Sequence, residues 1–282
     1  MNGTKNLLVE LRVEALRAIR LAPQRRARHR SAHDGRVDAA LVGELAAQIA
    51  ALRGRGLRVT VVSSGAIGTG LHVLGLSRRP EELPRLQACA AVGQAHLIQI
   101  FDDQLKPHGL HAAQILITRD DFEDRTRYLN IRNCINSLHE LGAVPILNEN
   151  DTVSVDEIRF GDNDIIAALV TNNLRANLLI LLTSVEGLCR DAARRDVIDV
   201  VERLDAKVTG LADASRSSLG SGGMASKLQA TGLVTEAGEA AVIACGRRKN
   251  VLVDLLEGKR VGTLFRPTPS KMTSRLGFIS IL

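Results

Sequence analysis

The residues best suited to chemistry lie between positions 148 and 164, in the sequence NENDTVSVDEIRFGDND. They follow the apolar run VPIL, which predicts a buried strand, so the polar side chains should emerge at the carboxyl end of that strand. Open α/β sheets bind ligands at this edge. Six carboxylates share the stretch with one cation, Arg159, and such crowding requires a ligand ammonium, a metal or a lysine. The alternative is a solvated acidic loop that ends in a helix N-cap at Asp162 or Asn163.

Two further segments are rich in small residues. The sequence SSGAIGTG at 63–70 follows a β-rich run, and backbone N–H groups in such a turn can approach an anion, although small residues serve equally well for packing. The sequence GSGGMASK at 220–227 precedes a helical pattern, so its N–H groups could surround phosphate oxygens and Lys227 would add a cation. Its spacing fits neither the Walker A nor the Rossmann pattern, and a plain linker is the alternative. Together, these turns supply what phosphoryl transfer requires.

The elements that must position these turns alternate between strand and helix. Residues 7–21 fit either a helix or a strand that begins at 7–9. Beyond them, the pattern predicts strands at 59–62, 112–117, 144–147 and 178–182, and helices at 37–54, 86–105, 125–141 and 162–173. This alternation is typical of a mainly parallel sheet covered by helices on both faces.

Composition and charge exclude several classes of protein. The net charge of +6 comes from the N-terminal part, because residues 1–36 hold nine basic and three acidic residues and the remainder holds 28 of each. Aromatic residues make up 2% of the chain, so base-stacking surfaces and nucleic-acid binding are not expected. No apolar run approaches the length of a membrane helix, and we expect a cytoplasmic protein. The four cysteines show no metal-binding spacing, which predicts reduced thiols and neither disulfides nor structural zinc.

The segments SSGAIGTG, AAVGQ, NEND, GDND, LLT, SGGMASK and VGTLF, in this order, resemble the glutamate 5-kinase family of the amino acid kinase superfamily. The resemblance extends from about residue 35 to 275 and implies a three-layer αβα sandwich with a mainly parallel central sheet. It implies phosphorylation of the side-chain carboxylate of L-glutamate with ATP and Mg²⁺, giving glutamyl 5-phosphate in the first step of proline biosynthesis. We expect a divergent basic arm at 1–36 and a kinase domain at 37–282, without the C-terminal PUA domain of many relatives.

The resemblance also assigns roles to individual residues. Lys227 would stabilise charge on the transferring phosphoryl group, and Asp164 would orient the phosphate-binding lysines. The residues expected to hold glutamate are Ser64, Asp151 and Asn163, with Asn148 and Asp162 close by. The residues expected to contact the nucleotide are Thr183, Ser184, Ser221, Gly222, Gly223, Met224, Ala225, Ser226 and Lys227. No metal ligand from the protein is expected, proline is a candidate inhibitor, and self-association of relatives implies a homo-oligomer.

This sequence departs from the family pattern near its N-terminus. The nearest alignment places Glu10 at the lysine and Arg12 at the glycine of the family's Lys-x-Gly phosphate turn. A carboxylate repels phosphate and an arginine cannot take a glycine's close approach, which predicts weakened activity. Ser184 also replaces a common aspartate. The alternatives are a homologue that binds glutamate or proline without turnover, and a related kinase for another carboxylate.

Overall fold

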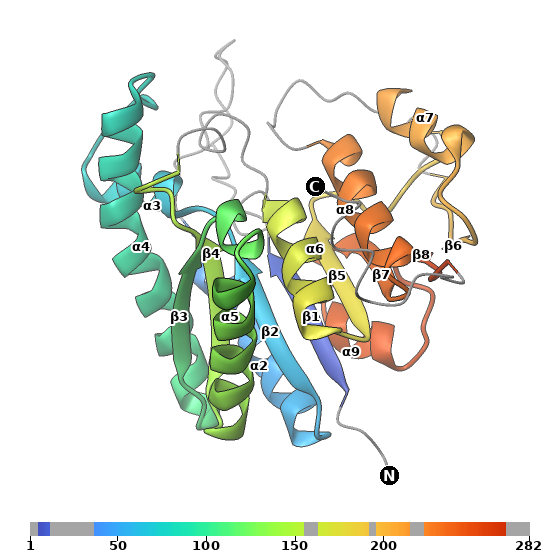
Figure 1. Ribbon diagram of the computed structural model, residues 1–282, viewed down its shortest axis with the longest axis horizontal. Coiled ribbons are helices and arrows are strands. Elements are labelled where there is room, and N and C mark those ends of the chain that lie inside the picture. Colours follow the sequence, from blue (N-terminus) through green and yellow to red (C-terminus); the bar gives the residue numbers. More distant parts are fainter. Residues whose placement is uncertain (1–4, 12–36, 155–162, 192–195, 215–222, 269–282) are drawn as a thin grey trace, which may run out of the picture.

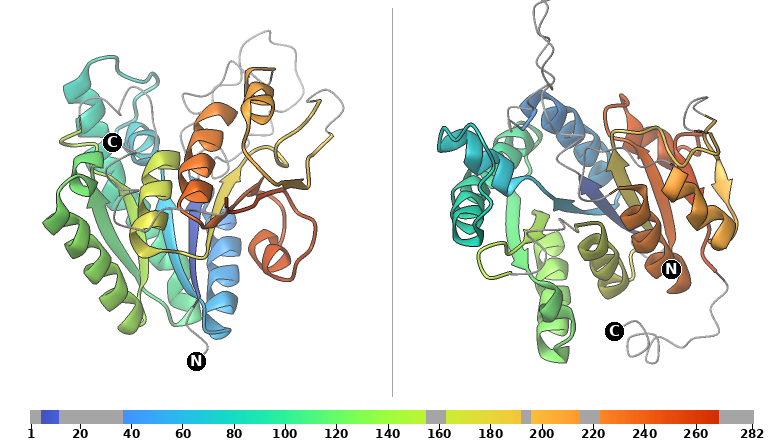
Figure 2. Two further views of the ribbon diagram at one scale, coloured as in Figure 1. Left: turned by 45° about the vertical axis from the view of Figure 1, so that its right-hand side comes forward. Right: turned by 90° about the horizontal axis from the view of Figure 1, so that it is seen from above.

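The computed structural model describes residues 5–11, 37–154, 163–191, 196–214 and 223–268 (Figure 1). In this part of the chain, eight strands form one sheet and helices cover both of its faces. The view along the strands places α2 on one side of the sheet and α5, α6 and α8 on the other (Figure 2, right). The three-layer αβα prediction is therefore confirmed.

The bounds of the elements agree closely with the sequence pattern where that pattern was clear. The strands are β1 (Asn6–Leu11), β2 (Arg58–Ser63), β3 (Ala112–Ile117), β4 (Val144–Glu149), β5 (Leu178–Thr183), β6 (Val200–Val201), β7 (Ala240–Cys245) and β8 (Thr263–Phe265). The helices are α2 (Ala39–Gly54), α3 (Ala66–Val73), α4 (Leu83–Leu105), α5 (Arg125–Glu140), α6 (Asn163–Leu174), α7 (Ala206–Ala214), α8 (Met224–Glu236) and α9 (Val251–Leu256). Two short 3₁₀ helices are Lys106–His108 and Arg119–Phe122.

The sheet has the order β3-β4-β2-β1-β5-β7-β8-β6, and its neighbours are parallel except for β7 and β8. Strand β1 lies in the middle, with Leu8 between Thr60 of β2 and Leu179 of β5. The ambiguous start of the chain is therefore a strand over residues 6–11, while residues 12–36 lie outside the described part. Because β2, β4 and β5 run in the same direction, their carboxyl ends meet at one edge of the sheet (Figure 1, top).

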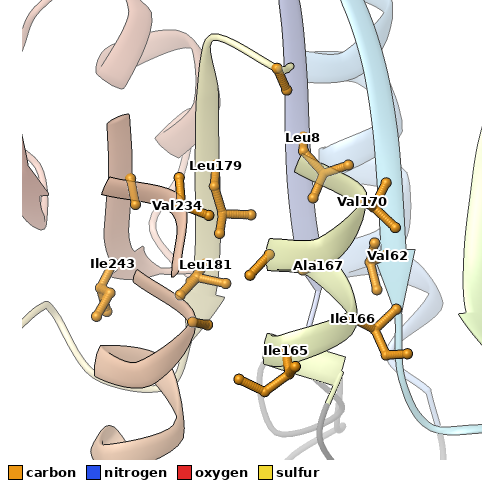
Figure 3. Packing of buried hydrophobic residues seen from close by; sticks show 14 of the residues in the cluster. Leu8, Val62, Ile165, Ile166, Ala167, Val170, Leu179, Leu181, Val234 and Ile243 are labelled. Atoms are coloured by element: carbon orange, nitrogen blue, oxygen red, sulfur yellow. The ribbon is translucent and has the colours of Figure 1, made fainter. Parts of the chain in front are cut away.

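Two hydrophobic cores hold the three layers together, one on each face of the sheet. Successive residues of a strand point to opposite faces. Val9 of β1 therefore packs in the core beneath α2, whereas Leu8 packs in the core beneath α6. Figure 3 shows Leu8, Ala167 and Leu181 in this second core. Burial on both faces explains why the central strands read as continuous apolar runs rather than alternating ones.

Helices α3 and α4 approach each other unusually closely through two glycines. A Cβ atom on Gly93 would lie 1.8 Å from the carbonyl oxygen of Ala66, and one on Gly70 would lie 1.8 Å from that of Cys89. No side chain fits at either place. Gly70 of the SSGAIGTG segment is therefore a packing residue, and the contact seats the turn that precedes Ala66 against α4.

A polar cluster joins helices from both faces at the amino edge of the sheet. Arg53 of α2 donates from Nη1 to the carbonyl oxygen of Ala143 at 3.0 Å and to Nδ1 of His139 at 3.4 Å. Since Nδ1 accepts, Nε2 carries the proton and donates to Oγ1 of Thr60 at 2.8 Å. Burial, and then the charges of Arg53 and Arg58, lower the pKa of His139 to about 4. The imidazole is therefore neutral at physiological pH.

No helix within the described ranges is both long and apolar enough to cross a bilayer. The four cysteines are free thiols, and two of them, Cys89 and Cys245, are buried.

Candidate active site

Three chain segments meet where strands β2 and β4 end and helix α6 begins. Ser63 is the last residue of β2, Asn148 and Glu149 end β4, and Asn163 is the first residue of α6. The acidic stretch therefore emerges at the carboxyl edge, as the sequence predicted. Asp162, one of the expected glutamate-binding residues, lies outside the described residues.

A network of side-chain amides connects these segments. Asn163 donates from Nδ2 to the carbonyl oxygen of Ser63 and to Oδ1 of Asn148, both at 3.2 Å. Asn148 in turn donates from Nδ2 to Oε1 of Gln94 at 2.9 Å, and its Oδ1 accepts the backbone N–H of Glu149 at 2.8 Å. Both hydrogens of the Asn163 amide are therefore used.

The carbonyl oxygen of the Asn163 side chain has no partner among the described residues, although it is buried. An unpaired buried acceptor costs about 1–3 kcal/mol. Because an oxygen can only accept, the group that would satisfy it must be a hydrogen-bond donor such as an ammonium. A ligand with a hydrogen-bond donor would satisfy this oxygen.

The next residue of α6 faces a different part of the molecule. Asp164 is fully buried, and its Oδ2 lies 3.4 Å from Nζ of Lys227, which is 2% exposed. Ser226 donates from Oγ to the same carboxylate oxygen at 2.6 Å. The positive end of the α6 helix dipole stabilises the carboxylate of Asp164. Lys227, by contrast, lies in the first turn of α8, where the positive end of that helix dipole disfavours a cation. Asp164 therefore stabilises a cation at a helix N-terminus, where anions bind.

The solvated-loop alternative is wrong for the carboxylates of Glu149 and Asp164, which are both buried. Glu149 is 5% exposed and accepts a hydrogen bond from Oγ of Ser154 at 2.8 Å, and Asp164 is buried completely. Asp151 and Ser64 are each half-buried, in the turns after β4 and β2. The turn after β4 is closed by a hydrogen bond of 3.1 Å from the N–H of Ser154 to the carbonyl oxygen of Asn150.

The residues expected to contact a nucleotide lie at the ends of β5 and at the start of α8. Thr183 is buried at the end of β5, and Ser184 after it is exposed. Gly223 precedes α8 and is exposed, while Met224 and Ala225, its first residues, are half-buried and exposed. Ser221 and Gly222, the expected start of the phosphate loop, lie outside the described residues, as do Arg12 and the side chain of Glu10.

Sequence reasoning missed Gln94. The residue lies in the quoted AAVGQ segment, but a single polar residue in a long helix gives no signal of its partner. For metal ions, the described ranges contain no group of three or more His, Cys, Asp or Glu side chains placed to bind one.

Comparison with known proteins gives three findings. A model of the amino acid kinase family matches residues 30–245. The chain is 44% identical over 248 residues to the glutamate 5-kinase of Marinomonas sp. (strain MWYL1), covering 86% of this chain and 66% of that protein. It is 44% identical over 243 residues to the glutamate 5-kinase of Methylococcus capsulatus, covering 85% of this chain and 65% of that one. The chain thus spans a little less than two thirds of the length of these relatives.

Among solved structures, the fold is similar to that of the carbamate kinase from Giardia lamblia bound to AMP-PNP. The TM-score is 0.63 at 17% identity, and the match covers 95% of this chain and 100% of that one. At this identity, the likeness supports the fold alone.

Proposed function

Because this chain belongs to the amino acid kinase family, we propose that it transfers the terminal phosphoryl group of ATP to the side-chain carboxylate of L-glutamate, forming glutamyl 5-phosphate for proline biosynthesis. The observation that carries the proposal is the first turn of α6. Its first residue, Asn163, joins the ends of β2 and β4, and its second, Asp164, contacts Lys227 of α8. One helical turn thus connects the proposed amino acid pocket with the proposed phosphate pocket.

The amino acid pocket requires acceptors for an ammonium and must leave the reacting carboxylate free. The unpaired oxygen of Asn163 supplies one buried acceptor, and the carboxylate of Asp151 supplies a negative charge in the turn after β4. Ser64, in the turn between β2 and α3, would donate to a substrate carboxylate. Asn148 supports this arrangement indirectly, because its amide holds Asn163 in place.

The phosphate pocket requires positive charge and backbone donors. Residues 223–227 provide a glycine before a helix N-terminus and a buried lysine in its first turn, and both features bind phosphate oxygens. Lys227 would neutralise charge that develops on the phosphoryl group, with Asp164 and Ser226 fixing its position. Mg²⁺, carried mainly by the nucleotide phosphates, would neutralise further charge there.

No covalent enzyme intermediate is needed in this proposal. The carboxylate oxygen of glutamate attacks the terminal phosphorus, the bond to the bridging oxygen of ADP breaks, and the protein contributes orientation and charge. Proline, which shares an amine and a carboxylate with glutamate, is proposed as a competing ligand of the same pocket. A homo-oligomer is proposed from the resemblance alone.

The test is coupled release of ADP with the full chain, L-glutamate, ATP and Mg²⁺. We expect release that depends on glutamate and is slower with N-acetylglutamate, which lacks the ammonium. If no glutamate-dependent release occurs in the native chain or after Glu10→Lys with Arg12→Gly, the proposal is overturned. Calorimetry with glutamate then distinguishes a binding protein without turnover from a protein that does not recognise glutamate.

A further inference from the structure

We propose that Gln94 of α4 is a positioning residue that holds the side-chain amides of Asn148 and Asn163 in the orientation that leaves Oδ1 of Asn163 for the substrate. Gln94 acts through Asn148, whose Nδ2 donates to Oε1 of Gln94 at 2.9 Å. This inference rests on the proposed function, because it assigns the substrate ammonium to the unpaired oxygen of Asn163.

The direction of the amide network is fixed at two places by backbone groups, which cannot reverse their roles. The N–H of Glu149 can only donate, so Asn148 must present Oδ1 to it. The carbonyl of Ser63 can only accept, so Asn163 must present Nδ2 to it. In these orientations, Asn148 directs its donor group, Nδ2, towards α4. The residue at position 94 must therefore offer an acceptor to pair with it.

Gln94 can reach this place because of the residue before it. Gly93 lies against the carbonyl oxygen of Ala66, where any Cβ would clash, so α4 passes close to the turn that follows β2. Helix α4 thereby brings the side-chain carbonyl of Gln94 to the buried end of β4. Gly93 therefore allows the close contact between the helices, and Gln94 supplies the hydrogen-bond acceptor for the amide network.

Removing this acceptor would leave Nδ2 of Asn148 without its partner on α4 and would loosen the side chain that accepts from Asn163. The expected effect falls on the amino acid pocket, because the network contacts the carboxyl ends of β2 and β4. The contact between Lys227 and Asp164 is not part of this amide network, so nucleotide binding should be spared.

The kinetic experiment compares Gln94→Met, which keeps the length but removes the acceptor, with Gln94→Glu, which keeps an acceptor oxygen. We expect Gln94→Met to raise the KM for glutamate about 10-fold, the size typical of one lost partially buried hydrogen bond, with kcat and the KM for ATP within about 2-fold. Gln94→Glu should restore the KM for glutamate to within about 3-fold of the native value. The matched control is Gln99→Met, which removes an exposed hydrogen bond to Asp103 on the same helix and should change neither constant.

Equal impairment of the Met and Glu variants, a parallel rise in both KM values, or no rise at all in Gln94→Met would overturn the proposal. A measurement that needs no substrate distinguishes an incorrect role for Gln94 from an incorrect proposed function. In the ligand-free chain, the side-chain NH₂ of Asn163, assigned by its loss in Asn163→Ala, should exchange slowly with water. Gln94→Met should accelerate this exchange at least about 10-fold, whereas Gln94→Glu should not. Unchanged exchange in Gln94→Met would overturn the role of Gln94, whether or not the chain phosphorylates glutamate.

Discussion

Two buried polar clusters lie at opposite edges of the same sheet, and they differ in how completely their groups are paired. At the amino edge, both ring nitrogens of His139 are bonded, one to Arg53 and one to Thr60. At the carboxyl edge, Asn163 has an unpaired oxygen, and Asp164 shares a buried ion pair with Lys227. The first cluster is complete within the chain and serves to join two helical layers. In the second, the side-chain oxygen of Asn163 has no donor among the described residues.

An unpaired oxygen is not sufficient by itself to identify a binding group. Asn172 and Asn173 also have buried side-chain oxygens without a partner in the described ranges, at the far end of α6. The first turn of α6 differs because its second residue, Asp164, forms a buried ion pair with Lys227 in the first turn of α8, just after Gly223. The carboxyl edge is distinguished by having both the unpaired oxygen of Asn163 and the buried ion pair in the same helical turn.

The largest expected effect tests whether the ion pair serves activity or only stability. Lys227→Met should lower kcat about 10²–10³-fold, the cost of one electrostatic donor, and should lower the free energy of unfolding by about 3 kcal/mol because Asp164 stays buried without its cation. The double variant with Asp164→Asn should recover most of the stability but not kcat, as measured by urea unfolding and ADP release. Recovery of kcat in the double variant would show that the lysine is only structural.

The next effect concerns the unpaired oxygen. Asn163→Ala removes this acceptor together with two donated hydrogen bonds, so the KM for glutamate should rise about 10–100-fold. The KM for ATP should change much less, since the nucleotide side of α6 is retained. Initial-rate kinetics with each substrate varied in turn measures the difference. Asn172→Ala at the other end of α6 is the control, and an equal effect there would remove the distinction between the two ends.

The cluster at the amino edge should affect stability but not turnover. The pKa of His139 is about 4 in the folded chain and 6.5 in the unfolded chain, so the two states bind protons equally above pH 6.5. As the pH falls from 6.5 to 4, the unfolded state gains a proton first, and the folded state should lose about 2 kcal/mol of stability. Urea unfolding at pH 7.5 and 4.5 should show that His139→Gln loses this part of the pH dependence. His108→Gln, which changes an exposed histidine, should behave like the native chain. The same change in the free energy of unfolding between the two pH values for the native chain and both variants would contradict the prediction.

The smallest expected effect involves Glu239, whose buried Oε2 has no partner in the described part of the chain. Burial raises the pKa of this carboxyl to about 7 although Arg175 opposes the shift. Since the folded pKa exceeds the unfolded one, stability is lost as the pH rises from 4.5 through 7. Glu239→Gln should therefore be more stable than the native chain at pH 8 by about 1 kcal/mol and should show little gain at pH 5. Glu236→Gln, which changes an exposed carboxylate, serves as the control in thermal unfolding.

The sequence allowed prediction of the parts that depend on local patterns. Strand β3 has the expected bounds, and Asn148 lies at the carboxyl end of β4, because apolar runs and the residues that end them are neighbours in sequence. The start of the chain was ambiguous because LLVEL fits two periods, and only pairing with β2 and β5 makes it a strand. The contact of Asp164 with Lys227 spans 63 residues, and it was expected from family resemblance rather than from any local pattern.

Other parts of the site could not be predicted because they depend on packing between distant elements. The bond between Gln94 and Asn148 joins residues 54 positions apart and requires α4 to pass close to β4. The burial of Glu149 likewise depends on the layers that surround β4, because its polar sequence neighbours are equally compatible with a solvated loop. The strands near the C-terminus, β7 and β8, were also missed.

The contact between α3 and α4 has a consequence for directed evolution. Alanine is usually the mildest replacement for glycine, yet even its methyl group would overlap a backbone carbonyl at positions 70 and 93. A library randomised across both helices and selected for growth should therefore return glycine at these two codons and tolerate variety at outward-facing neighbours such as His96. Attempts to enlarge the amino acid specificity should keep both codons fixed and place their diversity elsewhere.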